Sequence, residues 1–125
     1  MPIPAYITSV KEGPDKPIAW LRGELKTPPL SKGARIEAGT LLRRLQSGEK
    51  LSMPESRPLP SVDPRCQELR IDDIATKIEW RIVYYMGRNA VAILDIFPKK
   101  TRKTPDNVLA QCRRRLAEFK QVDRS

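Results

Sequence analysis

The chain has 125 residues, of which 39% are hydrophobic and 31% are charged, and its formal net charge is +9. This length and composition suit a single soluble globular domain over residues 1–125, with residues 1–15 as an extended arm. No segment approaches the roughly 20 apolar residues of a membrane span, and the N-terminus lacks the basic and apolar regions of a secretory signal. We therefore expect a protein without a membrane partner.

The first third of the chain predicts a short edge strand followed by two helices. The strand covers Ala5–Val10. The first helix runs from Pro17, a residue type favoured at the first helical position, to Leu25, and the Thr-Pro-Pro that follows ends it. Ser31 can cap a second helix, Lys32–Gln46. At the 3.6-residue period of a packed face, this helix carries Ala34, Ala38, Leu41, Leu42 and Leu45. The two helices predict a helical hairpin.

A Pro-rich connector at 51–64 separates these helices from a segment with the two-residue period of β-strands. Three strands are predicted in this segment: Gln67–Ile71, Lys77–Met86 and Ala90–Phe97. Gly87, Arg88 and Asn89 supply turn chemistry between the last two. These two strands should therefore form an antiparallel hairpin.

A final helix is predicted after the strands. Thr104 is a suitable N-cap, Pro105 suits the first helical position and Asp106 complements the helix dipole. One stripe of this helix carries Val108, Leu109, Cys112, Leu116 and Phe119. The order of elements predicts an α+β fold, in which a small antiparallel sheet has the N-terminal helical hairpin on one face and is completed by the C-terminal helix.

The sequence lacks the residues that several kinds of catalytic and binding site require. It contains no histidine and no CxxC motif, so His-based catalytic triads and zinc sites are not expected. Glycine-rich phosphate loops are also missing from the sequence. We therefore expect neither a metal nor a small-molecule cofactor. Cys66 and Cys112 lie far apart in apolar runs, which predicts buried, reduced thiols and a reducing, cytoplasmic location.

Positive charge is concentrated near the C-terminus. Residues 96–125 contain nine basic and three acidic side chains and so carry +6 of the net +9. This asymmetry is expected of a protein that binds a polyanion such as nucleic acid; the alternatives are a solvated basic face and an acidic protein partner. The densest group is Lys99, Lys100, Arg102 and Lys103, which precedes a helix N-terminus that favours phosphate; a solvated loop is the alternative. Arg113 belongs to a second basic run, which predicts diffuse contact with RNA backbone or with solvent.

Cations also lie within the predicted strands. Arg81 and Tyr85 share one face of a strand, whereas Tyr84 points to the other face and is expected in the core. Arg70 lies on the neighbouring strand. An arginine in an apolar strand needs a compensating group. That group is either phosphate, which the guanidinium fork suits, or a nearby carboxylate from Glu68, Asp72, Glu79 or Asp95.

Short segments of the chain occur in a particular order. They are Leu41-Leu42-Arg43-Arg44-Leu45 with Gly48 and Leu51, Pro54 and Arg57-Pro58-Leu59, Glu68-Leu69-Arg70-Ile71, Arg81-Ile82-Val83-Tyr84-Tyr85, and Phe97-Pro98-Lys99-Lys100-Thr101-Arg102-Lys103-Thr104-Pro105. This ordered set covers roughly residues 16–120 and resembles the phage-derived HigB-like group of the RelE toxin superfamily.

The resemblance implies a RelE-like domain that acts as the toxin of a type II toxin–antitoxin pair. Such a toxin would cleave mRNA on the ribosome without a metal, by attack of the 2′-OH on the adjacent phosphorus, and a helix-turn-helix antitoxin would neutralise it. The residues assigned to catalysis are Arg81 and Arg70 on the phosphate with Lys100 and Tyr85 in proton transfer or base stacking, and those assigned to RNA binding are Lys99, Arg102, Lys103 and Arg113. The alternatives are a non-catalytic RNA- or DNA-binding module and a phage structural or host-interaction protein.

Overall fold

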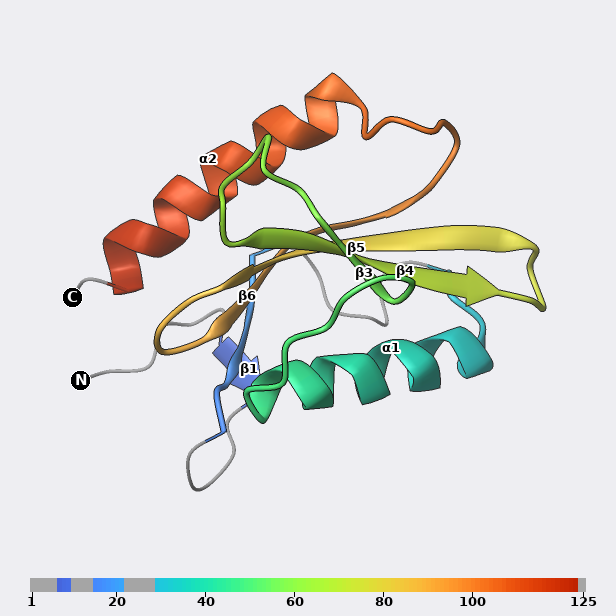
Figure 1. Cartoon of the computed structure of the whole chain (residues 1–125), viewed down its shortest axis with the longest axis horizontal. Helices are drawn as coiled ribbons and strands as arrows, with labels where there is room; N and C mark the ends of the chain where they lie inside the picture. Colours follow the sequence, from blue (N-terminus) through green and yellow to red (C-terminus); the bar gives the residue numbers. More distant parts are fainter. Residues whose placement is uncertain (1–6, 10–14, 22–28, 124–125) are drawn as a thin grey trace.

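The computed structural model describes residues 7–9, 15–21 and 29–123. Within these ranges six strands form one sheet in the order β1-β2-β6-β5-β4-β3, with helix α1 on one face and helix α2 on the other (Figure 1). The elements are β1 (Ile7–Ser9), β2 (Ile18–Trp20), α1 (Lys32–Gln46), β3 (Ser56–Pro58), β4 (Cys66–Asp73), β5 (Ile78–Met86), β6 (Val91–Pro98) and α2 (Asp106–Asp123). The predicted α+β fold is confirmed. Neither helix in the described ranges has the length and apolar character needed to cross a membrane.

The centre of the sheet consists of the three predicted strands. β4 pairs antiparallel with β5, and β5 pairs antiparallel with β6. In the turn between β5 and β6, the Gly87 N–H donates to the Ala90 carbonyl at 2.9 Å. A Cβ added at Gly87 would lie 2.8 Å from that carbonyl oxygen, which explains why glycine occupies this position. The predicted antiparallel hairpin is therefore confirmed.

Helix α1 begins and ends where the sequence predicts. The Ser31 hydroxyl accepts a hydrogen bond from the Ala34 N–H at 3.2 Å, as an N-cap should. The Ser31 N–H donates to the Asp73 carboxylate at 2.8 Å, which ties the start of the helix to the end of β4. The predicted apolar stripe of α1 is buried against a core that includes Trp80, Ile82 and Tyr84. The expectation that Tyr84 belongs to the core is thereby confirmed.

The predicted helix from Pro17 to Leu25 is wrong where the structure describes it, because Ile18–Trp20 forms strand β2. β2 pairs with β6 in parallel, so the sheet is mixed rather than wholly antiparallel. Ile18 is buried in the core under α1 and Ala19 in the core under α2. A strand buried on both faces loses the polar alternation that would reveal it.

The rest of that segment, 22–28, lies outside the described residues. Consequently the described residues contain no helical hairpin on this face, and α1 covers it alone. Strand β1 pairs antiparallel with β2 and falls within the predicted edge strand Ala5–Val10, whose positions 5, 6 and 10 also lie outside the described residues.

Helix α2 packs on the opposite face of the sheet through its predicted stripe. Its first backbone acceptor is the Pro105 carbonyl, which receives the Val108 and Leu109 N–H groups at 3.1 Å each. Thr104 was expected as the N-cap, but its hydroxyl donates to Glu68 instead. Cys66 and Cys112 are free and buried in this second core, as predicted. Burial raises the pKa of both thiols to about 12, which makes them unreactive.

Candidate functional site

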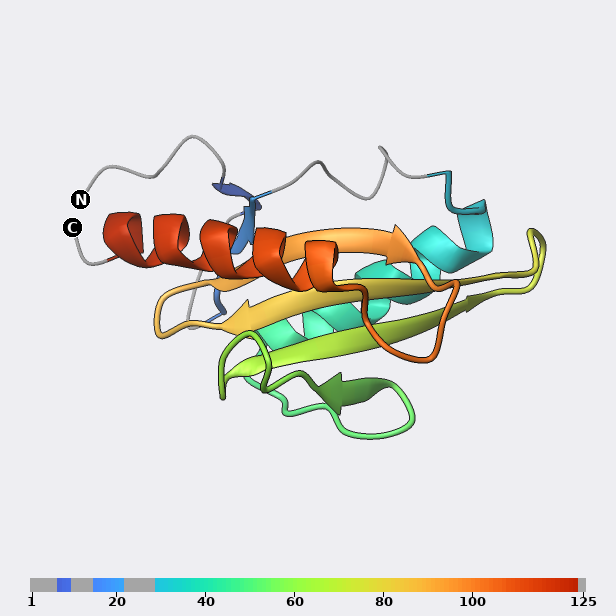
Figure 2. The ribbon, with the colours of Figure 1, turned by 90° about the horizontal axis from the view of Figure 1, so that it is seen from above.

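The segment between β6 and α2 folds over the face of β4 and β5 that α2 leaves open (Figure 2). Beneath it is a small cavity of about 10 Å³, which we call the loop pocket. The loop pocket is lined by Arg57, Glu68, Arg81, Phe97 and residues 99–105. Its interior holds no more than about one water molecule. Any larger anion would therefore bind at the rim of the pocket and not inside it.

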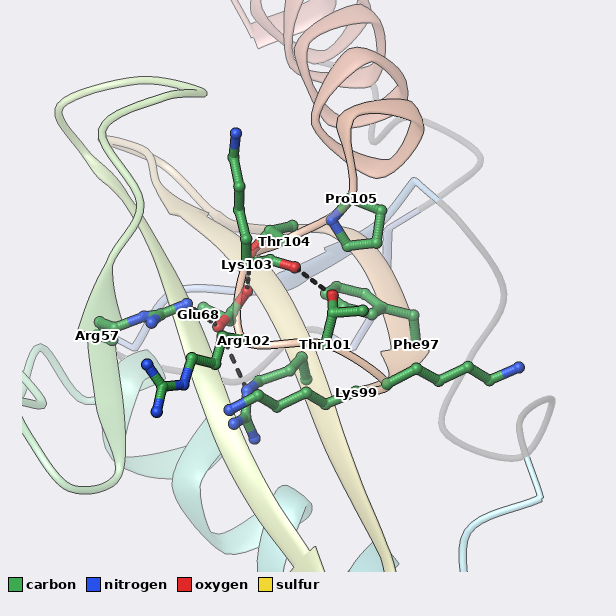
Figure 3. A pocket seen from close by; sticks show the side chains of 11 residues that line it. Arg57, Glu68, Phe97, Lys99, Thr101, Arg102, Lys103, Thr104 and Pro105 are labelled. Carbon is green, nitrogen blue, oxygen red and sulfur yellow. Dashed lines mark hydrogen bonds and ion pairs between the residues drawn. The ribbon is translucent and has the colours of Figure 1, made fainter.

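A buried carboxylate is at the centre of the loop pocket. Glu68 is only 1% exposed, and its Oε1 accepts a hydrogen bond from Arg57 at 2.9 Å. Its Oε2 accepts a hydrogen bond from the Thr104 hydroxyl at 2.9 Å. Figure 3 shows Arg57, Glu68 and Thr104 turned toward one another. β3, β4 and the start of α2 are thereby tied to one acidic side chain.

Arg81 is the buried cation of this network. Its Nε lies 3.3 Å from Glu68 Oε1, and its NH2 lies 3.4 Å from the Oε2 of Glu79, whose side chain is 46% exposed. Burial is the largest influence on Arg81 and lowers its pKa, while the two carboxylates oppose the shift. The ion-pair interpretation of Arg81 is therefore confirmed, and both partners are among the carboxylates that the sequence offered.

The four cations of the loop between β6 and α2, Lys99, Lys100, Arg102 and Lys103, line the same pocket as the Arg81–Glu68 pair. Lys99 is tied to Glu79, because its N–H donates to the Glu79 carbonyl at 2.7 Å and its Nζ lies 3.9 Å from the Glu79 carboxylate. Lys100, Arg102 and Lys103 are exposed, and Figure 3 shows the Lys103 side chain extending away from Glu68. The loop thus adds accessible positive charge to the buried arginine.

Arg70 lies beside the loop pocket and does not line it. It is directly opposite Arg81 in the β4–β5 register, so both side chains are on the same face of the sheet. The Arg70 charge is one of the influences that lower the pKa of Arg81. Its guanidinium reaches toward the sulfur of Met53 at 3.9 Å, at the edge of a neighbouring hollow. The hollow also contains Glu37, Glu55, Asp72 and Glu79.

Two predicted site residues lie elsewhere. The Tyr85 ring contacts Phe119 edge-on, at 6.1 Å between centroids, near the C-terminal half of α2. Arg113 is exposed on α2, and its Nε donates to the Ser61 carbonyl at 2.9 Å. Neither residue lines the loop pocket. The structure therefore brings Arg81 together with the loop cations but separates Tyr85 and Arg113 from them.

The three residues of the hydrogen-bond network around Glu68 that sequence reasoning did not assign to the site are Arg57, Glu68 and Thr104. The sequence indicates Glu68 only as an ion-pair partner of Arg81, Thr104 only as a helix cap, and Arg57 only as part of a family segment. Arg57 reaches the pocket because β3 pairs with β4, which places Arg57 opposite Glu68. Because β3 has only three residues and ends in Pro58, its sequence shows no alternating pattern that would predict a strand. A lone arginine in a Pro-rich connector gives no further signal.

Comparison with known proteins assigns the chain to a family. The family model described as "Phage derived protein Gp49-like (DUF891)" matches residues 27–117. The match spans α1, β3 to β6, the loop pocket and most of α2. No curated protein and no solved structure matches the chain. The chain therefore belongs to the phage-derived Gp49-like family, which is part of the RelE/HigB-like group of toxins from type II toxin–antitoxin systems.

Proposed function

We propose that this protein is a toxin that cleaves mRNA on the ribosome without a metal, and that a helix-turn-helix antitoxin neutralises it. The observation that carries the proposal is the loop pocket, where exposed Lys100 and Arg102 surround the buried pair of Arg81 and Glu68. Family membership supports the toxin role and the antitoxin partner. The position of the cations supports a phosphate as the group on which the protein acts.

The reaction needs charge stabilisation and two proton transfers. The 2′-OH of one nucleotide attacks the adjacent phosphorus, the bond to the 5′-oxygen breaks, and the products are a 2′,3′-cyclic phosphate and a 5′-OH. The lysine pair Lys99 and Lys100 transfers the protons: the 2′-OH gives up one proton to this pair as it attacks, and the leaving 5′-oxygen receives one proton from it. The arginines stabilise the additional negative charge that develops on the phosphate oxygens.

Arg81 reaches the phosphate by exchanging one partner. Its contact with Glu79 is long at 3.4 Å, and the Glu79 side chain is 46% exposed, so a phosphate oxygen can replace it at the NH2 edge. Glu68 stays in place and holds the Nε edge. Glu68 is thus a positioning residue, which orients Arg57 and Arg81 toward the RNA.

The test uses the exposed part of the pocket, because changing the buried Arg81 also disturbs the fold. The variant is Lys100→Ala/Arg102→Ala, and its matched control is Lys32→Ala/Arg35→Ala, which removes two exposed cations from α1 on the other face of the sheet. Primer extension maps mRNA ends in a translating extract. We expect wild type and control to cut, and the pocket variant to cut about 100-fold more slowly.

Absence of cutting by the wild-type protein in this extract would exclude the nuclease. RNA retention without cutting, accompanied by a steep dependence on salt, would instead favour a non-catalytic RNA-binding module. Equal cutting by the two double variants would show that the exposed loop cations do not serve the reaction.

A further inference from the structure

A second basic hollow lies at the opposite end of α2 from the loop pocket. We call it the hairpin hollow; it has a volume of about 430 Å³ and is lined by Arg65, Tyr85, Arg88, Asn89, Lys120 and Asp123. Figure 2 shows the β5–β6 hairpin and the C-terminal end of α2 at the same end of the molecule. Unlike the loop pocket, this hollow has room for a nucleotide-sized group.

An aromatic ring with cations beside it forms the wall of the hairpin hollow. Lys120 Nζ lies 5.3 Å from the centroid of the Tyr85 ring, and the guanidinium carbon of Arg65 lies 5.8 Å from it. Phe119 supports the same ring edge-on, and Lys120 is held by Asp63 at 3.0 Å. The ring and one of its cations are therefore fixed before any ligand arrives.

The balance of charge in the hairpin hollow favours an anion. Three of its lining residues are cations and only Asp123 is acidic. Arg65, Arg88 and Asn89 are exposed. Asn89 adds an amide that can both donate and accept a hydrogen bond, as the edge of a base requires. Cations combined with an aromatic ring are typical of sites for single-stranded nucleic acid, whereas an acidic peptide would need the cations alone.

We propose that the hairpin hollow binds a nucleotide of the single-stranded RNA substrate away from the cleaved phosphate. Arg65, Arg88 and Lys120 contact its phosphodiester, and Tyr85 and Asn89 contact its base. This inference rests on the proposed function, since it assumes RNA as the substrate. It gives Tyr85 a role in holding RNA and not in proton transfer.

The two sites are far enough apart to hold different nucleotides. Arg81 and Tyr85 point to the same face of β5 and are separated by four residues, or about 13 Å at 3.3 Å per residue. Between them Val83 is fully buried in the core under α2, so RNA that fills both sites runs over the surface of the protein and not along the strand. Exposed Arg113 lies on α2 between the start of the helix, at the loop pocket, and Lys120, where it can contact the intervening backbone.

The experiment measures binding separately from cleavage. A short fluorescein-labelled single-stranded RNA, 2′-O-methylated throughout so that it cannot be cut, is titrated with the full-length protein, and anisotropy is recorded at several salt concentrations. The variants are Arg65→Ala/Arg88→Ala and the control Lys32→Ala/Arg35→Ala, which removes the same charge from exposed positions on α1. Thermal melting verifies that both variants fold.

We expect the hollow variant to bind about tenfold more weakly than the control, with the slope of log affinity against log salt reduced by about 0.7 for each phosphate that the variant no longer neutralises. Tyr85→Leu should also weaken binding, and Tyr85→Phe should preserve it. Equal affinity and slope for the two double variants would overturn the inference. Poly-glutamate that binds as tightly as the RNA and is equally sensitive to the variants would overturn it as well, since it would indicate a general anion site. If the extract assay shows no cleavage while these binding results are as expected, the nuclease fails and the RNA site stands.

Discussion

The loop pocket and the hairpin hollow are both basic, yet only the loop pocket buries one of its cations. In the loop pocket Arg81 is 2% exposed and shares the Glu68 carboxylate with Arg57. In the hairpin hollow Lys120 remains 40% exposed and lies beside an aromatic ring. Buried charges need a partner of opposite sign, whereas exposed charges keep their hydration and remain available to a ligand. The loop pocket therefore combines one buried arginine of fixed geometry with exposed loop cations, whereas none of the cations that line the hairpin hollow is buried.

The largest effect is expected from breaking the buried pair. Glu68→Ala leaves the buried Arg81 with the long contact to Glu79 as its ion pair, so the free energy of unfolding should fall by about 3–5 kcal/mol. Urea denaturation measures the change. Glu49→Ala is the control, because Glu49 forms an exposed salt bridge with Arg44, whose loss should change the free energy of unfolding little. Similar losses in both variants would erase the distinction between buried and exposed charge.

A smaller effect is expected where the network meets α2. Thr104→Val keeps the shape of the side chain but removes the hydrogen bond that Glu68 Oε2 accepts, and should lower stability by about 2 kcal/mol. Thr104→Ser keeps the hydroxyl and should therefore retain most of the wild-type stability. Thr101→Val is the matched control, since the Thr101 hydroxyl makes its hydrogen bond to Lys103 in an exposed loop. A melting temperature of Thr104→Val equal to that of Thr101→Val would argue that Thr104 does not couple the helix to the pocket.

The smallest effect is expected at the hairpin hollow, and it should depend on pH. Burial opposes ionisation of Asp63, but hydrogen bonds from the Arg65 N–H and from Lys120 outweigh it and lower the pKa of Asp63. The same hydrogen bond raises the pKa of Lys120. Lys120→Ala should cost less than about 1 kcal/mol at neutral pH, because the Lys120 side chain is 40% exposed and solvent screens the pair.

The direction of the pH dependence follows from these two shifts. Because folding lowers the pKa of Asp63, this group stabilises the fold at pH values above its unfolded-state pKa of about 3.9. Because folding raises the pKa of Lys120, this group stabilises the fold at pH values below its unfolded-state pKa of about 10.4. The advantage of wild type over Lys120→Ala should thus be present between these limits. It should disappear as pH falls through the lowered pKa of Asp63, or rises through the raised pKa of Lys120. Urea unfolding of wild type and Lys120→Ala across this pH range tests the prediction. A difference in their free energies of unfolding that persists in strong acid would contradict the ion-pair explanation.

Elements with strong local signals were predicted correctly. α1 has both its N-cap Ser31 and its apolar stripe in one stretch of sequence, and the hairpin of β5 and β6 has alternating strands around Gly87. Where the local preference for a helix or a strand was weak, the prediction was wrong. Ile18–Trp20 is too short to show a hydrophobic period, and it becomes a strand because it pairs with the edge of β6. The hydrogen bonds that β6 offers exceed the small helical preference of so short a segment.

The sequence by itself determined that the protein is basic, that its positive charge lies toward the C-terminus, and that histidine plays no part in its chemistry, since the chain has none. Only the tertiary structure decided how these residues are grouped. Strand pairing placed Arg57 and Arg81 on one buried Glu68 and brought Arg65 beside Tyr85, and the packing of α2 placed Lys120 beside the Tyr85 ring. Periodicity assigns a side chain to a face, but its neighbours on that face come from segments distant in the chain, and long-range packing alone selects them.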